Sequence, residues 1–226
     1  MSALTSALTS AHTPAPTPAT FYFDLVSPFA YLMWKQLRRN ATLALRPEPV
    51  LLGGLLQHWG QLGPAEVPPK RIQIYRMCQW LADRHDIPLR FPDVHPFRSI
   101  EALRLLVALD ARVDAVDALF DAVFRDGLDL GDPANLEAFG RALGLERVTE
   151  VLAAPSVKDR LRANTEAAIA RGVFGVPTVE VGTELFWGFD TIGMIDGYLV
   201  NPGLFRAPAM IRLEGLGYGV PRRTGG

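Results

Sequence analysis

The sequence predicts an α/β protein in which a mixed β-sheet is interrupted by a long helical segment. Strand and helix patterns alternate near the N-terminal end, and apolar residues recur at helical spacing through the middle of the chain. Two short strand-like segments return near residue 180 and are followed by one more helical pattern. The resulting order, βαβ, helical insertion and ββα, is typical of a thioredoxin-like fold with an inserted all-helical domain.

The first elements form a βαβ unit. We expect folded structure to begin at Thr20, because the aromatic run Phe21-Tyr22-Phe23 favours a strand. Apolar residues at helical spacing then predict a helix from Pro28 to about Arg39, and the segment from Leu43 to Val50 favours a second strand. A strand, a helix and a strand over so few residues indicate a parallel pair joined by a right-handed crossover.

The middle of the chain is predicted to be helical. Apolar stripes separated by proline and glycine breaks indicate helices over residues 70–84, 100–109, 113–125, 133–143 and 157–171. Strand character returns at Thr178–Val181 and Leu185–Trp187, and the short turn between them predicts a hairpin. A last helix is expected from about Thr191 to Leu199.

These patterns divide the chain into four parts. Residues 1–20 are almost entirely Ala, Ser, Thr and Pro, a composition that predicts a disordered tail. Residues 21–53 and 165–200 form a discontinuous thioredoxin-like domain, and residues 54–164 form the inserted helical domain. Residues 201–226 are rich in Gly and Pro and are expected to be an irregular C-terminal extension, packed through Leu204, Phe205 and Ile211.

Composition excludes several kinds of chemistry. The chain has 226 residues, 49% of them hydrophobic, a formal net charge of -1 and one cysteine. The balanced charge gives no electrostatic reason for a nucleic-acid or membrane partner. A single cysteine excludes an internal disulfide, a CxxC redox pair and a multi-cysteine zinc site, and it makes the cytoplasm the expected location. Cys78 is expected to be a packed hydrophobe, and the four histidines lack metal-ligand spacing, so no metal is predicted.

Ser27-Pro28 begins the first predicted helix. Serine is a preferred N-cap and proline is preferred at the first helical position, so the pair is consistent with a purely structural role. The same geometry also suits anion binding, because exposed N–H groups and the positive end of the helix dipole stabilise an anion such as a thiolate. The residues alone leave both interpretations open.

Two further segments are candidate ligand contacts. Pro177 either starts an edge strand or forms a cis peptide bond that would turn the backbone N–H and C=O of Val176 toward an extended peptide ligand. Asp190, after the second hairpin strand, either caps the last helix or binds an ammonium group.

The opening run from Phe21 to Leu32, which contains Ser27-Pro28, resembles the start of the 2-hydroxychromene-2-carboxylate isomerases. These are relatives of the kappa-class glutathione transferases in the DsbA-like thioredoxin superfamily. The resemblance extends over roughly residues 21–199, through Pro64–Lys70, His95–Ser99, Ala102–Arg104, Phe120–Leu145, Gly172–Thr178 and Phe186–Asp190.

The resemblance implies a glutathione-dependent cis–trans isomerase of an aromatic-degradation intermediate. Ser27 is then expected to face the glutathione sulfur, Val176 before a cis Pro177 to pair with the cysteinyl backbone, and Asp190 to hold the γ-glutamyl group. It also implies a homodimer and an aromatic carboxylate substrate, for which Lys70 and Arg98 are candidate contacts, although a solvated surface arginine is the more common finding.

The sequence departs from the family pattern at four places. Gln61, which the resemblance makes an expected glutathione contact, stands where the family usually has an asparagine. Met77 and Trp80 replace parts of a helix motif, and Thr191 replaces an arginine. Two alternatives to the isomerase therefore stay open: a kappa-like glutathione transferase or peroxidase, and a thioredoxin-fold binding module without activity. A thiol–disulfide oxidoreductase is disfavoured, because Ser27 occupies the position of the nucleophilic cysteine.

Overall fold

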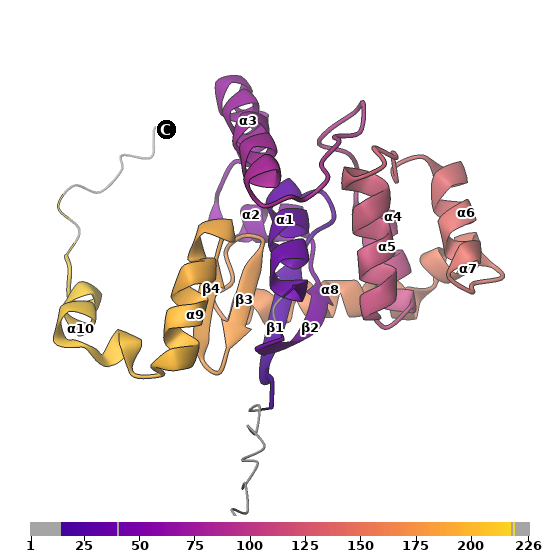
Figure 1. Cartoon of the computed structure of the whole chain (residues 1–226). Coiled ribbons are helices and arrows are strands. Elements are labelled where there is room, and N and C mark those ends of the chain that lie inside the picture. Colours follow the sequence, from indigo (N-terminus) through magenta and orange to yellow (C-terminus); the bar gives the residue numbers. More distant parts are fainter. Residues whose placement is uncertain (1–14, 40, 218, 220–226) are drawn as a thin grey trace, which may run out of the picture.

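A computed structural model describes residues 15–39, 41–217 and 219. Its centre is a four-stranded sheet in the order β2-β1-β3-β4 (Figure 1). The strands are β1 (Thr17–Phe23), β2 (Leu43–Pro49), β3 (Thr178–Val181) and β4 (Glu184–Trp187). β1 and β2 are parallel, whereas β3 is antiparallel to both β1 and β4. The predicted βαβ unit, the hairpin and the thioredoxin-like α/β fold are thus confirmed.

β1 begins earlier than expected. Thr17 pairs with Leu43 at the start of β2, so the strand has a partner along its whole length. The expected start at Thr20 is therefore wrong, and residues 17–20 belong to the sheet rather than to a tail. Composition did not indicate this, because Thr17, Pro18 and Ala19 resemble the preceding segment while their backbone pairing depends on β2. Residues 15 and 16 precede the strand, and residues 1–14 of the predicted tail lie outside the described residues.

Ten α-helices and three short 3₁₀ helices are present in the described chain. They are α1 (Pro28–Arg38), α2 (Leu52–Trp59), η1 (Pro64–Glu66), α3 (Pro68–Arg84), α4 (Ile100–Ala108), α5 (Val113–Phe124), α6 (Pro133–Ala142), α7 (Val148–Ala153), α8 (Pro155–Ala170), η2 (Phe189–Thr191), α9 (Ile192–Val200), η3 (Leu204–Arg206) and α10 (Pro208–Glu214). α2 and α7 are not predicted by the sequence, since each is too short for a clear period. None of the described helices is long and apolar enough to cross a bilayer.

The helical segment and the sheet share one hydrophobic core. Phe23 of β1 lies 5.3 Å from the ring of Phe120 of α5, and Tyr31 of α1 lies 5.5 Å from that of Phe124. α4–α7 lie at one end of the sheet, and α8 runs behind it in the view of Figure 1. The boundary predicted between residues 164 and 165 falls inside α8, which contacts both α4 and β2.

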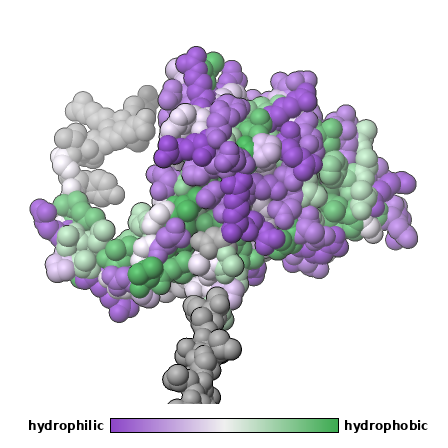
Figure 2. Space-filling model, in the orientation of Figure 1, coloured by the Kyte–Doolittle hydropathy of each residue, from purple (hydrophilic) through white to green (hydrophobic). Residues whose placement is uncertain are grey.

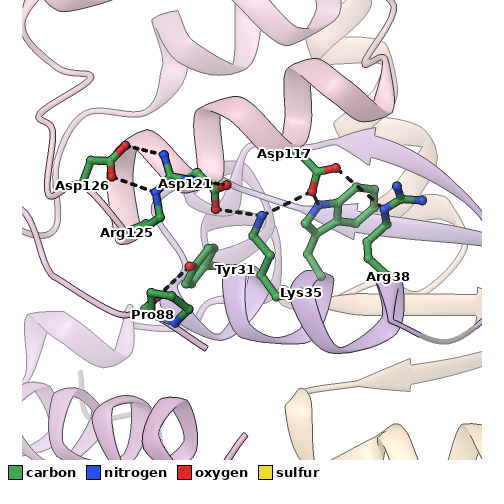
Figure 3. A network of polar contacts seen from close by, with 9 residues as sticks. Tyr31, Lys35, Arg38, Pro88, Asp117, Asp121, Arg125 and Asp126 are labelled. Atoms are coloured by element: carbon green, nitrogen blue, oxygen red, sulfur yellow. Dashed lines mark hydrogen bonds and ion pairs between the residues drawn. The ribbon is translucent and has the colours of Figure 1, made fainter. Parts of the chain in front are cut away.

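A polar network holds α1 against α5 (Figure 3). The indole N–H of Trp34 donates a hydrogen bond to Asp117 at 2.7 Å, and the ammonium of Lys35 lies 2.7 Å from Asp121. Asp121 also pairs with Arg125 at 3.0 Å. Because Ser27 caps the other end of α1, this network helps to fix the helix that carries the candidate site.

The C-terminal segment is more regular than predicted. It contains η3 and α10, and Phe205 packs against Phe186 and Tyr198 with ring centroids 5.9 and 5.7 Å apart. The expected packing of Ile211 is wrong, because this side chain is 52% exposed on α10. Apolar surface is visible along this projecting segment at the left of Figure 2. Residues 218 and 220–226 of the predicted extension lie outside the described part.

Candidate functional site

A pocket of about 690 Å³ lies between the thioredoxin-like elements and the helical segment. Its wall is formed by the first turn of α1, by α2, η1 and α3, and by the loops around residues 95–100 and 174–176. Five of the seven predicted site residues line it: Ser27, Gln61, Lys70, Arg98 and Val176. Elements from both halves of the discontinuous domain therefore meet at one cavity.

Ser27 is the N-cap of α1. Its Oγ accepts a hydrogen bond from the backbone N–H of Ala30 at 3.2 Å, which leaves the hydroxyl proton available for another acceptor. The first turn of α1 has no acidic side chain, and the N–H of Phe29 has no hydrogen-bond partner among the described residues. Since Ser27 and Phe29 both line the pocket, the positive end of the helix faces a cavity that suits an anion.

Asp24 organises the turn that precedes α1. This carboxylate is buried, with 1% of its surface exposed, and it accepts hydrogen bonds from the backbone N–H groups of Val26 at 3.0 Å and Leu52 at 2.9 Å. Burial raises its pKa, while hydrogen bonds from Ser99, Val26 and Leu52 act in the opposite direction. Asp24 thereby ties α1, α2 and the start of α4 together at the pocket.

The Val176-Pro177 peptide bond is cis, which resolves the alternative left open by the sequence. Pro177 is buried, whereas Val176 is half-buried and lines the pocket. Neither the N–H nor the C=O of Val176 has a hydrogen-bond partner within the described residues. The carbonyl of the neighbouring Pro177 is already used by Gly188 at 2.9 Å, so Val176 carries the available backbone groups of this loop.

The two predicted cations differ in their surroundings. Arg98 is 76% exposed at its side chain, and its guanidinium donates two hydrogen bonds to Glu101, at 3.0 and 3.1 Å. Lys70, on the first turn of α3, has no ion-pair partner in the described part of the chain. Lys70 is therefore the better placed of the two to bind an anionic group in the pocket. Gln61 lines the pocket from the exposed segment after α2.

Asp190 does not line this pocket. It is exposed on η2, three residues after Trp187, which does line the pocket at the end of β4. Thr191 is occupied in the same turn, where its hydroxyl donates to the carbonyl of Gly188 at 2.8 Å. Met77 and Trp80 also lie outside the pocket lining, on α3. Of the four departures from the family pattern, only Gln61 reaches the cavity.

Tyr75 and His95 line the pocket, although sequence reasoning gave them no role. Nε2 of His95 lies 2.8 Å from the carbonyl oxygen of Val26, and Nδ1 lies 2.7 Å from the hydroxyl of Tyr75. Burial lowers the pKa of His95 and raises that of Tyr75. Residues 26, 75 and 95 are far apart in the chain, so no local pattern could have indicated this contact.

The remaining lining is largely apolar. Aromatic side chains from four segments surround the cavity: Phe29, Phe97, Phe174 and Trp187. The rings of Phe174 and Trp187 have centroids 5.0 Å apart, and both residues are partly exposed. This combination of aromatic walls and a few polar groups suits a ligand that carries both an aromatic ring and an anionic group.

Cys78 is buried away from this site. Burial raises the pKa of its thiol to about 12, so it remains protonated and packed, as predicted. Among the described residues, no cluster of three or more His, Cys, Asp or Glu side chains suits a metal ion.

Comparison with known proteins places this geometry in a family. Residues 19–200 match the DSBA-like thioredoxin domain. The chain is 31% identical over 185 residues to a 2-hydroxychromene-2-carboxylate isomerase of Pseudomonas putida, an alignment that covers 78% of this chain and 91% of the relative. It is 26% identical to glutathione S-transferase kappa 1 of Homo sapiens, over 77% of this chain and 87% of the relative.

A solved structure of a 2-hydroxychromene-2-carboxylate isomerase agrees with this placement. It superposes with a TM-score of 0.72 at 26% identity and covers 84% of this chain and 98% of its own. The chain therefore belongs to the DSBA-like thioredoxin family, in the group that includes the 2-hydroxychromene-2-carboxylate isomerases.

Proposed function

We propose that this protein is a glutathione-dependent cis–trans isomerase that acts on an aromatic carboxylate with a conjugated double bond. The observation that carries the proposal is the meeting of Ser27 and Val176 at one aromatic-lined pocket. Each residue offers groups that a small thiol peptide requires, and the two residues come from the two separate parts of the thioredoxin-like domain. Relatives named as isomerases support the isomerase activity, and relatives named as kappa-class glutathione transferases support the use of glutathione.

We assign to Ser27 the role of stabilising the glutathione thiolate. Its hydroxyl proton is free to donate, and the N–H of Phe29, which has no partner in the described part of the chain, lies in the same helical turn. A charge-assisted hydrogen bond and the helix dipole both favour the ionised form of a thiol over its protonated form. Ser27 cannot itself form a disulfide, so its role is to stabilise the anion.

We assign to Val176 the role of pairing with the peptide backbone of glutathione. One N–H donor and one C=O acceptor on the same residue match the pairing that an extended peptide makes with a strand edge. Gln61 lines the same pocket and offers an amide to the rest of the tripeptide. Asp190, three residues after the end of β4, remains our proposed partner for the γ-glutamyl ammonium, although it does not line the cavity.

The substrate is assigned to the aromatic side chains and the lysine of the same pocket. Phe29, Phe97 and Phe174 provide apolar surface for an aromatic ring, and Lys70 provides a positive charge for the carboxylate. Glutathione, when bound, supplies a thiolate that adds reversibly to a conjugated double bond and so permits rotation about it. Ser27 holds the negative charge near the start of α1, and the aromatic wall keeps the ring in place while the side chain rotates.

The direct test uses the purified full-length chain. We expect glutathione to bind, and 2-hydroxychromene-2-carboxylate to be converted to its open trans isomer only when glutathione is present. Difference absorbance near 240 nm should show a thiolate in the complex at neutral pH. Absence of glutathione binding, together with absence of turnover, would overturn the proposal.

A kappa-like transferase is the second candidate, favoured by the similarity to glutathione S-transferase kappa 1. Conjugation of chlorodinitrobenzene measured beside chromene isomerisation separates the two. We expect isomerisation to be the faster reaction, because the pocket offers Lys70 for a carboxylate that chlorodinitrobenzene lacks. A faster conjugation would favour the transferase.

A further inference from the structure

Tyr75, His95 and the carbonyl of Val26 form a hydrogen-bonded chain at the pocket. A carbonyl oxygen only accepts hydrogen bonds, so the 2.8 Å contact requires that Nε2 of His95 carries a proton. In the neutral ring the other nitrogen, Nδ1, is then an acceptor, and the Tyr75 hydroxyl lies 2.7 Å from it. The structure therefore fixes one tautomer of His95 and directs its basic nitrogen at Tyr75.

The Tyr75 hydroxyl, on α3, has two possible acceptors, both of them on His95. It lies 2.7 Å from Nδ1 of His95 and 2.9 Å from the carbonyl oxygen of the same residue. When Nδ1 is unprotonated, Tyr75 donates to it. When Nδ1 is protonated, the same hydroxyl accepts from Nδ1 and donates to the carbonyl instead. In both protonation states of His95, Nδ1 and the Tyr75 hydroxyl thus keep hydrogen-bond partners without movement of the side chains. A pair that transfers a proton requires this.

The surroundings favour the neutral, basic form of His95. The rings of Phe91 and Phe124 lie 5.4 and 6.0 Å from it, and burial lowers its pKa. The other titratable groups that line the pocket are Asp24, Glu66, Lys70 and Arg98. The positive charge of Arg71 partly offsets the effect of burial on the pKa of Tyr75. None of them makes a hydrogen bond or an ion pair with His95 in the described chain.

We propose that Tyr75 and His95 transfer the proton that opens the ring of a cyclic hemiketal substrate. The proposal rests on the isomerase function, since a 2-hydroxychromene carries a hydroxyl and a ring oxygen on the carbon that bears its carboxylate. Tyr75 is the catalytic residue that contacts the substrate, and His95 acts through it. Ser27 takes no part in this step.

Ring opening requires no reactant beyond the substrate and these two side chains. The substrate hydroxyl gives its proton to Oη of Tyr75, and Tyr75 gives its own proton to Nδ1 of His95. The electrons of the broken O–H bond form the C=O of the open 2-oxo acid, while the bond from that carbon to the ring oxygen breaks and leaves a phenolate. The proton held at His95 then returns through Tyr75 to the phenolate oxygen.

The test compares two probes on the full-length protein with glutathione. One is 2-hydroxychromene-2-carboxylate, which needs ring opening. The other is the cis isomer of 2-methoxybenzylidenepyruvate, whose methylated oxygen cannot close a ring. We expect Tyr75→Phe to lower kcat on the first by about 10²-fold or more and to change turnover of the second by less than about threefold. Tyr198→Phe, which removes a hydroxyl outside the pocket, is the matched control.

His95→Gln separates basicity from positioning, because a glutamine amide still donates to Val26 and accepts from Tyr75. We expect kcat on the chromene to fall with KM unchanged, and the acidic limb of the kcat–pH profile to disappear. ¹⁵N NMR of the wild-type protein provides a readout apart from activity and should show the tautomer with the proton on Nε2.

The outcomes are distinguishable. If Tyr75→Phe slows both probes equally, or if NMR shows a proton on Nδ1 of neutral His95, the proton-transfer role is wrong while the isomerase function stands. If the wild-type protein converts neither probe, the isomerase function fails, and the ring-opening role fails with it.

Discussion

Oδ2 of Asp24 accepts a hydrogen bond from the backbone N–H of Leu52 at 2.9 Å, and its other oxygen accepts from Val26 at 3.0 Å. One buried carboxylate thereby joins the turn before α1 to the beginning of α2, and both segments line the pocket. The carbonyl of Asp24 also accepts from the N–H of Ser27 at 3.0 Å, so this residue fixes the backbone on which the candidate site is built.

Asp24→Asn should therefore destabilise the protein and weaken the site together. An amide has one acceptor oxygen and one NH₂ donor, so one of the two backbone N–H groups would face another donor. An unsatisfied buried donor costs about 1–3 kcal/mol. We expect the free energy of unfolding in urea to fall by that amount and glutathione binding to weaken. Asp93→Asn, at an exposed carboxylate, is the control, and equal effects of the two substitutions would contradict the role of Asp24.

Ser27→Ala should lower activity far more than stability. Loss of the cap costs about 1 kcal/mol, whereas loss of a donor that stabilises a reacting anion typically costs 10²- to 10³-fold in kcat. Asp132→Ala offers a matched control, because Asp132 caps α6 by accepting from Ala134 at 2.8 Å and lies outside the pocket. We expect similar losses of stability in both variants and a loss of turnover in Ser27→Ala alone. Equal losses of turnover in the two variants would show that Ser27 acts only as a helix cap.

The site shows which features a sequence pattern can indicate. Ser27 and Pro177 were predicted because a helix start and a proline before a strand are local signals. Asp24, Tyr75 and His95 were not, because their roles depend on partners 28, 20 and 69 residues away in the chain. Likewise, the sequence predicts the helices in which apolar residues recur at helical spacing over a long segment. The fold is missed at the start of β1 and at α2 and α7, where pairing and packing across the molecule determine the backbone, and at the short α10.

Lys70→Met and Arg98→Met should differ in their effect on substrate binding. Lys70 has no ion-pair partner among the described residues, whereas Arg98 is held by Glu101 at 3.0 Å and is mostly exposed. A hydrogen bond to a charged group contributes about 1.5–3 kcal/mol, or roughly 10- to 100-fold in affinity. We expect KM for the carboxylate substrate to rise by that factor in Lys70→Met and by less than about threefold in Arg98→Met. The reverse order would assign the carboxylate to Arg98.

Asp117→Ala should destabilise the contact between α1 and α5. The indole N–H of the fully buried Trp34 donates to Asp117 at 2.7 Å and would lose its acceptor, at a cost of about 1–3 kcal/mol. Glu150→Ala removes an ion pair with Arg147 in which both side chains are mostly exposed, and such pairs contribute about 0–1 kcal/mol. Thermal unfolding of both variants provides the comparison. A loss in Asp117→Ala no larger than that in Glu150→Ala would show that the network of Figure 3 adds little.

His95 should make the stability of the protein depend on pH below about 6.5. Burial lowers its pKa from the ordinary value of 6.5, opposed by the hydrogen bond to Val26, so the unfolded chain binds this proton more readily than the folded chain. Stability is then fully present above pH 6.5 and is lost as the pH falls through the lower pKa of the folded state. In His95→Gln we expect a smaller loss of unfolding free energy between pH 7.5 and pH 5.5 than in the wild type. His58→Gln, at an exposed histidine, should retain the wild-type dependence, and an unchanged dependence in His95→Gln would show that His95 is not the group responsible.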